Sequence, residues 1–291
     1  MRILITGGTG FIGRHLVPLM NQHQLMLIGK QKVSFDQSNL QYLNADLTVP
    51  EKWKKQVINF SPNACIHLAW SGLPDYSLSK CSKNFDINMQ LLDLLIKTEC
   101  KRIFIPGTCW EYGDLQGEVG EVDLPGTTNL FASFKTSVRL IGEWLTNSKP
   151  TGLVWGRIFF VYGDGQRPDS LIPSCYQSFI RGNKPEIRAP NCVNDFIHVS
   201  DVAKAILALV ETPAISGIFN IGSGKPTKVV DVCEIIANSL NRKNLLPEFE
   251  NATNTSELWA NTSLIRKVTN WRPQYTIQTG IEKTLNDLQS K

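Results

Sequence analysis

The sequence predicts an α/β fold in which a doubly wound parallel sheet has helices on both faces and a smaller mixed C-terminal lobe is attached. Short β-branched apolar runs alternate with helical patterns over the first half, which is the order that a parallel sheet requires. A glycine-rich segment closes the first run, and the pattern becomes less regular after Gly163. With 291 residues, 42% of them hydrophobic, the chain can bury one large core and a smaller lobe.

Strands and helices are expected in alternation up to Gly163. Strands are expected where apolar residues form short runs, at 2–6, 25–28, 64–70, 102–108 and 153–162. Helices are expected at 11–21, 50–60, 84–100 and 131–147. Beyond Gly163 the expected elements are a helix at 169–181, a strand at 195–199, a helix at 200–211, a strand at 218–221 and a helix at 228–241. These less regular segments are expected to form a lid or second lobe beside the sheet.

The charge and cysteine content exclude several functional classes. The 30 basic and 26 acidic residues are scattered, so no stripe suits a nucleic acid, and a small anionic ligand is the more economical partner. Seven cysteines without a CxxC pair, and no paired-histidine spacing, argue against a disulfide framework and a metal site. No run approaches the ~20 apolar residues of a membrane span, and the N-terminal apolar run is too short for a signal peptide. A cytoplasmic protein with reduced thiols, no metal and no membrane partner is expected.

The segment TGGTGFIG at 6–13 joins the first expected strand to the first expected helix. Gly7 permits a tight turn, Gly10 lets the backbone approach a pyrophosphate, and Gly13 lets helix and strand pack closely. The start of the helix, with Phe11 and Ile12, offers free N–H groups to phosphate oxygens. The strand-loop-helix context therefore predicts a dinucleotide-binding loop.

Residues 131 and 135 share one face of an expected helix, and they would form a Tyr-x-x-x-Lys pair if residue 131 were tyrosine. A phenol has a pKa of roughly 10, and a neighbouring ammonium lowers it toward the range of proton transfer at neutral pH. Phe131 has no hydroxyl and transfers no proton. The chain thus has the surroundings of a proton-transfer site without its central oxygen.

These motifs resemble those of the extended short-chain dehydrogenase/reductases that act on nucleotide sugars, a family with the Rossmann fold. The resemblance covers nearly the whole chain, in order. It also rests on Asp46-Leu47, His67-Leu68-Ala69, Asn88, Thr108, Tyr112-Gly113, RIFFVYG at 157–163, DFIHV at 195–199, NIGSG at 220–224 and Trp271-Arg272-Pro273. It implies a dinucleotide-binding domain at 1–165, with 191–222 returning to its sheet, and a nucleotide-sugar-binding lobe at 166–190 and 223–291.

The resemblance also implies catalytic roles. In the family a strand-end Ser or Thr, the Tyr and the Lys form one proton-handling unit. Thr108 is thus expected to hold the sugar oxygen, residue 131 to exchange its proton, and Lys135 to bind the cofactor ribose. A positioned proton donor typically contributes ~10²- to 10⁴-fold to the rate. With Phe131 the enzyme is expected to keep its ligands and to be impaired in redox chemistry.

Two explanations for Phe131 remain open. It is either an engineered Tyr→Phe change that traps a bound substrate or the residue of a naturally altered family member, and the maintained surroundings favour the engineered change. If restoring tyrosine leaves the activity unchanged, Tyr112 is the nearest alternative donor by sequence.

NADP(H) is the expected cofactor, and NAD is the less favoured alternative. The segment after the second strand contains Lys30 and Lys32, which can bind a 2′-phosphate, and no acid before Asp36. The resemblance places Asp46 and Leu47 by the adenine. It places Leu68, Ala69 and Trp70 along the ribose and pyrophosphate, and Phe159 is expected in the same site.

Cys109 and Trp110 follow Thr108 and narrow the reaction. Members resembling the 4,6-dehydratases have an Asp-Glu pair there, and members resembling the 3,5-epimerases have a Cys at the position of Trp110. Neither reaction is therefore expected. The expected function is NADPH-dependent reduction of a nucleotide-linked 4-keto sugar. The alternatives are a nucleotide-sugar 4-epimerase with tightly bound NAD and a noncatalytic NADP-binding sensor or scaffold.

Asn194 occupies the position where the family usually has an arginine that clamps the substrate diphosphate. Arg167 and Arg188 are the expected substitutes, since a guanidinium offers paired donors to a diphosphate. Trp110 and Phe160 are further expected substrate contacts, together with Thr108.

The expected helices at 84–100 and 131–147 have apolar residues on more than one side. This pattern predicts burial against both the sheet and a second subunit. A symmetric homodimer built on a four-helix bundle, as in the resembling family, is expected.

Overall fold

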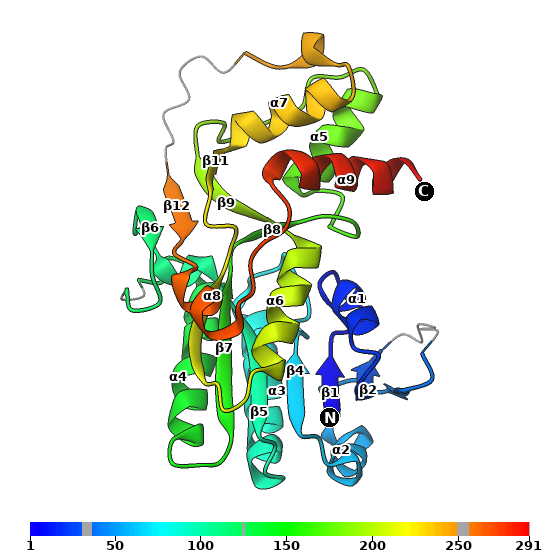
Figure 1. Ribbon diagram of the computed structural model, residues 1–291, viewed down its shortest axis with the longest axis vertical. Coiled ribbons are helices and arrows are strands. Elements are labelled where there is room, and N and C mark those ends of the chain that lie inside the picture. Colours follow the sequence, from blue (N-terminus) through cyan, green and yellow to red (C-terminus); the bar gives the residue numbers. More distant parts are fainter. Residues whose placement is uncertain (31–36, 124–125, 249–255, 291) are drawn as a thin grey trace.

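Seven parallel strands form the larger of two sheets in the computed structural model, which describes residues 1–30, 37–123, 126–248 and 256–290 (Figure 1). They lie in the order β10-β7-β5-β4-β1-β2-β3, and every pairing between neighbours is parallel. The sheet extends from β1 in both directions, which confirms the predicted doubly wound arrangement. The strands are β1 (Arg2–Thr6), β2 (Gln24–Gly29), β3 (Leu40–Asn44), β4 (Ala64–His67), β5 (Arg102–Thr108), β7 (Gly152–Ile158) and β10 (Gly217–Ile221).

Helices cover both faces of this sheet because successive residues of a strand point to opposite sides. On β1, Ile3 and Ile5 are buried in one apolar cluster and Leu4 in another. Strands that are apolar on both faces are typical of parallel sheets between two helical layers. The first cluster contains residues of α1 (Gly13–Leu16) and α6 (Val199–Glu211), and the second contains residues of α2 (Lys54–Phe60), α3 (Leu78–Lys97) and α4 (Leu130–Thr146).

A second, mixed sheet forms the core of the smaller lobe, as predicted. Its strands lie in the order β11-β9-β12-β6, with β8 paired to β9, and it combines an antiparallel pair with parallel ones. The strands are β6 (Gly117–Val119), β8 (Phe160–Tyr162), β9 (Val193–His198), β11 (Pro226–Lys228) and β12 (Glu257–Ala260). The helices of this lobe are α5 (Leu171–Ile180), α7 (Val229–Ser239) and α9 (Ile277–Gln289), and α8 (Ser263–Thr269) packs against the larger sheet.

The expected strand at 153–162 is in fact two strands in different sheets. β7 ends at Ile158 and β8 begins at Phe160, where the chain passes from the larger sheet to the smaller one. The Phe159 amide still donates to the Ile221 carbonyl of the neighbouring strand, at 3.0 Å. Within 191–222, only β10 joins the larger sheet, whereas β9 belongs to the smaller sheet.

The helix boundaries also differ from the expected ones. α3 begins at Leu78, six residues before the expected start at 84. The sequence pattern did not reveal this earlier start because the first turn of the helix is exposed and lacks an apolar period. The expected helix at 11–21 is limited to the four residues of α1 and a short 3₁₀ turn at Val17–Leu19 that contains Pro18. A proline cannot donate the hydrogen bond that would continue an α-helix.

The carboxyl ends of the larger sheet's strands point toward the smaller lobe (Figure 1). Ligands of open α/β sheets bind at this edge, where the strand order diverges from the centre. Within the described ranges, no helix combines the length and apolar character needed to cross a bilayer. In the same ranges, no three His, Cys, Asp or Glu side chains are grouped as metal ligands would be.

Candidate active site

A cavity of about 360 Å³ lies at the carboxyl ends of β1, β2 and β4. It brings together most of the residues expected to bind the cofactor. These are Gly7, Gly10, Lys30, Asp46, Leu47, Leu68, Ala69 and Trp70. Thr9, Ser71 and Asn84 also line it and were not expected from the sequence. Asn84 could not be recognised because its contact with Ser71 depends on the loop between β4 and α3.

The glycine loop beside this cavity leaves no room for side chains at two positions. Gly7 has a positive φ of 71°, and a Cβ there would lie 2.6 Å from the Ala69 amide nitrogen. A Cβ on Gly13 would lie 2.4 Å from the Gly7 carbonyl oxygen. Phe11 and Ile12 lie between Gly10 and the start of α1, and both are half-buried. The loop therefore has the tight turn and the close packing of helix on strand that the first and third glycines of a dinucleotide-binding loop provide.

The end of β2 pairs a cation with an acid. Lys30 Nζ lies 2.9 Å from a carboxylate oxygen of Asp46, and both side chains line the cavity. The sequence suggested separate roles for them, Lys30 at a 2′-phosphate and Asp46 at the adenine. Lys32, the second expected phosphate ligand, lies outside the described residues.

Thr108 is the last residue of β5 and the N-cap of a 3₁₀ helix at Cys109–Tyr112. Its hydroxyl accepts a hydrogen bond from the Trp110 amide, at 3.3 Å, and its own amide donates to a carboxylate oxygen of Glu111, at 2.9 Å. These two bonds form a capping box. They hold Thr108 at the carboxyl edge of the sheet, facing the smaller lobe.

Glu111 is a functional neighbour that the sequence analysis missed. It is fully buried and accepts hydrogen bonds from Arg157 Nε at 3.0 Å and from Trp155 Nε1 at 3.0 Å. Arg139 on α4 contributes a second buried guanidinium, at 3.9 Å. The spacing Thr108-x-x-Glu111 is that of a capping box and was the available signal. The network links the Thr108 turn to both β7 and α4.

Lys135 lies on α4 one turn after Phe131 and is only 4% exposed. Its Nζ donates to the Pro106 carbonyl at 2.8 Å, two residues before Thr108 on β5. The same atom lies 4.2 Å from the centroid of the Trp70 ring and 5.8 Å from that of Phe131. Burial lowers the pKa of this ammonium to about 7. The lysine thus connects the cofactor cavity with the turn that contains Thr108.

Phe131 is surrounded by an aromatic cluster made of Trp70, Tyr76, Trp110 and Phe131 itself. Its ring centroid lies 5.1 Å from that of Trp70, 5.2 Å from Tyr76 and 6.0 Å from Trp110. The cluster joins three segments: the loop between β4 and α3, which contains both Trp70 and Tyr76, the turn after β5, and α4. The structure therefore brings Thr108, Trp110, Phe131 and Lys135 into one region beside the cofactor cavity.

Tyr112, the alternative donor suggested by the sequence, faces away from this region. Its side chain is fully buried, and its hydroxyl lies 2.7 Å from Asn220 Oδ1 and 2.9 Å from the Gly120 carbonyl oxygen. Burial raises the pKa of Tyr112 to about 12. Phe159 packs beside this tyrosine in the apolar cluster under the 3₁₀ turn, and it does not line the cofactor cavity.

A second cavity, of about 540 Å³, lies in the smaller lobe. Three of the expected substrate residues, Phe160, Arg188 and Asn194, line it. Arg167 lies 3.6 Å from Asp169, another residue of its lining. Arg188 lies 3.5 Å from Glu186, and both of these side chains are exposed. Exposed pairs of this kind contribute little, so either guanidinium can exchange its carboxylate for another anion.

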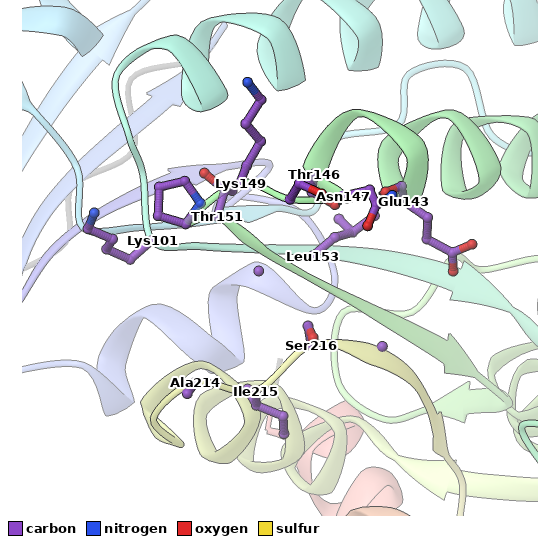
Figure 2. Close-up of a pocket in the computed structure, with 14 residues that line it drawn as sticks. Lys101, Glu143, Thr146, Asn147, Lys149, Thr151, Leu153, Ala214, Ile215 and Ser216 are labelled. Carbon is purple, nitrogen blue, oxygen red and sulfur yellow. Dashed lines mark hydrogen bonds between the residues drawn. The ribbon is translucent and has the colours of Figure 1, made fainter.

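Figure 2 shows a further cavity, of about 530 Å³, with Lys101, Lys149 and Ser216 among its lining residues. It lies at the amino ends of β5, β7 and β10, because its lining includes residues at or just before the starts of those strands. This edge is opposite the one at which ligands of open α/β sheets bind. None of the expected site residues lines it.

Residues 3–222 match the family model described as the NAD dependent epimerase/dehydratase family. The chain is 27% identical to a dTDP-4-dehydro-6-deoxyglucose reductase of Escherichia coli, over 99% of this chain and 98% of the relative. It is 26% identical to a dTDP-L-rhamnose 4-epimerase of Burkholderia thailandensis, over 96% of this chain and 93% of the relative. The fold superposes with a TM-score of 0.87 and 20% identity on a UDP-glucuronic acid 4-epimerase from Bacillus cereus, with 100% of this chain and 99% of that one covered. That structure is of a tyrosine-to-phenylalanine mutant in complex with UDP-4-deoxy-4-fluoro-glucuronic acid and NAD.

Proposed function

Because the chain belongs to the NAD-dependent epimerase/dehydratase family, whose members are NAD(P)-dependent enzymes, we propose that it reduces the 4-keto group of a nucleotide-linked sugar with NADPH. The cofactor cavity and the cavity of the smaller lobe are the proposed sites for the two ligands. In this assignment the dinucleotide-binding domain consists of residues 1–165 apart from β6 and β8, together with α6 and β10. Residues 166–190 and 223–291 form most of the nucleotide-sugar lobe.

The residues of the first cavity fit a dinucleotide. A Cβ on Gly7 or Gly13 would collide with the protein's own backbone, so only glycine permits this tight loop, and the cavity runs from the loop past the end of β2 to Trp70. Lys30 lies at the end of β2, where a 2′-phosphate would be bound. Lys135 Nζ would bind the ribose at the far end of the cavity, as the resemblance implies.

One observation favours reduction over dehydration. The side chains of Cys109 and Glu111, which follow Thr108, are buried in the core. Cys109 is 3% exposed, and burial raises the pKa of its thiol well above the usual range, so it is no base at neutral pH. The carboxylate of Glu111 is fully buried among Arg157 and Trp155 and is not directed at a substrate. Elimination of water needs an additional acid and base, whereas reduction of a ketone needs only a hydride and one proton.

The proposed roles follow from this geometry. Bound NADPH supplies the hydride. Thr108 donates a hydrogen bond to the carbonyl oxygen of the sugar, and the ammonium of Lys135 fixes the ribose. Phe131 cannot supply the proton, and its apolar ring, 9% exposed, helps to exclude water from the reacting centre. In the smaller lobe, Phe160 would pack on the base, and Arg167, Arg188 and Asn194 would bind the diphosphate.

A nucleotide-sugar 4-epimerase with bound NAD is the second candidate. The ion pair between Lys30 and Asp46 favours it, because a lysine already neutralised by a carboxylate attracts a 2′-phosphate less strongly. An epimerase of this kind would also use Thr108 and Lys135.

The test uses the Phe131→Tyr protein, in which the proton donor of the family is restored. We expect it to oxidise NADPH when given dTDP-4-dehydro-6-deoxyglucose or another nucleotide-linked 4-keto sugar, followed at 340 nm. Conversion of UDP- or dTDP-linked 4-hydroxy sugars without net NADPH consumption, together with NAD in the purified protein, would indicate the epimerase instead. The absence of both reactions across the panel would contradict both candidates.

A further inference from the structure

One of the three side chains around Phe131 has a hydroxyl that can exchange a proton. Tyr76 is half-buried, and its ring centroid lies 5.2 Å from Phe131 and 5.7 Å from Trp110. Within the described part of the chain, its hydroxyl has no hydrogen-bond partner. The hydroxyl is also not enclosed in the core. It is therefore free to donate to a ligand that binds against the aromatic cluster.

The loop that contains Tyr76 is held at both ends. At its start, Ser71 exchanges two backbone hydrogen bonds with the Asn84 side chain, at 2.8 and 2.9 Å. At its end, the Ser77 amide donates to Asp75 at 2.9 Å, and Ser77 is the N-cap of α3. Tyr76 thus lies two residues before a long helix, in a loop whose two ends are fixed by hydrogen bonds, and this fixes the position of its ring.

Each of the other polar groups near Phe131 has a bonding partner in the protein, and two of them also have a proposed role at a ligand. The Thr108 hydroxyl caps its own turn, and an alcohol of this kind is too weak an acid to be the donor. Lys135 Nζ donates to the Pro106 carbonyl. The Tyr112 hydroxyl is bonded to Asn220 in the core. Among these candidates, Tyr76 alone combines a phenol, contact with the Phe131 ring and an unengaged hydroxyl.

We propose that, in the chain with phenylalanine at 131, the Tyr76 hydroxyl donates the proton to the carbonyl oxygen of the bound 4-keto sugar. This inference rests on the proposed reductase function. The hydride of NADPH forms the new C–H bond at the carbonyl carbon and leaves NADP⁺. The O–H bond of Tyr76 breaks as the O–H bond of the product alcohol forms, and the resulting phenolate then takes a proton from water.

The experiment compares four proteins that differ only in where a tyrosine hydroxyl is placed: the parent chain, Tyr76→Phe, Phe131→Tyr, and the double variant. Each is assayed with NADPH and a nucleotide-linked 4-keto sugar. We expect Tyr76→Phe to lower kcat by ~10²-fold or more, because one positioned acid is removed. Adding Phe131→Tyr to that variant should restore the rate. Phe131→Tyr in the presence of Tyr76 should change kcat less than tenfold, which is a smaller gain than the sequence alone predicts.

If Tyr76 were needed only for the structure of the site, Tyr76→Phe would change the fold and ligand binding as well as the rate. Since Tyr→Phe keeps the ring, we expect an unchanged near-UV circular dichroism spectrum, an unchanged calorimetric Kd for NADPH, and an unchanged KM for the sugar. Tyr275→Phe is the matched control, because Tyr275 is also half-buried against an aromatic ring, that of His198, but does not belong to the aromatic cluster around Phe131. It should retain the parent rate.

Two outcomes would overturn the inference and leave the reductase function standing. One is a parent rate in Tyr76→Phe. The other is an inactive parent chain beside an active double variant, since the family's own donor would then be the only one that works. Inactivity of all four proteins would contradict the proposed function and the role of Tyr76 with it.

Discussion

The Nζ atom of Lys30 lies 2.9 Å from a carboxylate oxygen of Asp46, across the end of the cavity proposed for the cofactor. The two residues come from the ends of neighbouring parallel strands, β2 and β3. Both side chains are well exposed, at 57% and 36%, so the pair itself stabilises the fold little. Its main effect is on the binding of an anionic ligand, because the carboxylate partly neutralises the lysine that a 2′-phosphate would contact.

The first prediction concerns cofactor choice. Asp46→Asn should tighten NADPH binding severalfold, because Lys30 then faces the 2′-phosphate without a competing carboxylate. Lys30→Glu should weaken NADPH binding by roughly tenfold or more and favour NADH, because the side chain beside the 2′-phosphate changes from a positive to a negative charge. Fluorescence titration with both reduced cofactors measures this. Lys55→Glu, an exposed charge reversal on α2, should leave both affinities unchanged. Equal responses to NADPH and NADH in all variants would count against the assignment.

The second prediction follows from the burial of Lys135. Its pKa falls to about 7 in the folded protein from an ordinary value of 10.5, so between these values the unfolded chain binds more protons. The contribution of Lys135 to the unfolding free energy therefore rises with pH from about 7 to 10.5. Below pH 7 the folded protein bears the full cost of burying the charged ammonium. Lys135→Met should raise the unfolding free energy of the ligand-free protein at pH 6, on the order of 2–5 kcal/mol. This advantage should shrink toward pH 10.

Urea denaturation at pH 6 and pH 9.5 tests this pH dependence. Lys267→Met, which removes an exposed lysine from α8, is the control and should show no pH-dependent difference from the parent. If Lys135→Met differed from the parent by the same amount at both pH values, the lowered pKa would be refuted.

Much of the larger sheet could be predicted because its strands are apolar on both faces and are separated by helical patterns. The strands that escaped prediction are short or exposed, whereas α9, a helix of 13 residues with Ile281 and Leu285 buried, was simply not predicted. β6 and β11 have three residues each and β12 has four, which is too short for a detectable period. The early start of α3 was hidden because Leu78 is 62% exposed and gives no apolar signal. The division of 153–162 depends on pairing with β9, which no local pattern reveals.

The parts of the candidate site that depend on contacts between distant segments also escaped prediction. The positions of the glycines and of the strand ends beside the cavity could be predicted from the sequence because they depend on the local backbone. Tyr76 and Trp70 could not be placed beside Phe131, because the contact is made by a loop between β4 and α3 that folds back onto α4. The pairing of Lys30 with Asp46 was missed for a similar reason, since it depends on the register of β2 and β3.

The third prediction concerns the buried carboxylate of Glu111. Glu111→Gln removes a charge that is bonded to Arg157 at 3.0 Å in a fully buried site. The guanidinium is then left without its counter-charge, so we expect a loss of about 3–5 kcal/mol in unfolding free energy. The matched control is Asp93→Asn, which breaks a pair with Lys97 of similar length, 2.8 Å, between side chains that are 59% and 70% exposed. That change should cost less than about 1 kcal/mol. Similar losses in the two variants, measured by urea denaturation, would argue against the predicted effect of burial.

The fourth prediction concerns assembly. α3 and α4 pack against each other on one face of the sheet, and α4 exposes three large apolar side chains near its end. Leu140 is 54% exposed, Ile141 37% and Trp144 77%. Residues three and four apart share one helix face, so these side chains form a continuous apolar surface. An exposed surface of this kind is typical of an interface, and two copies of the α3–α4 pair would bury it in a symmetric four-helix dimer.

We therefore expect the parent protein to be a dimer at micromolar concentration and the Ile141→Lys/Trp144→Lys variant to be a monomer, as measured by light scattering after gel filtration. Charged side chains at both positions would have to be desolvated in the interface, which costs more than the contact returns. Ile180→Lys provides the control, since Ile180 is also an exposed apolar residue, at 48%, but lies on α5 in the smaller lobe. It should remain a dimer. A monomeric parent would refute the interface, and a dimeric double variant with native circular dichroism would place the interface elsewhere on the molecule.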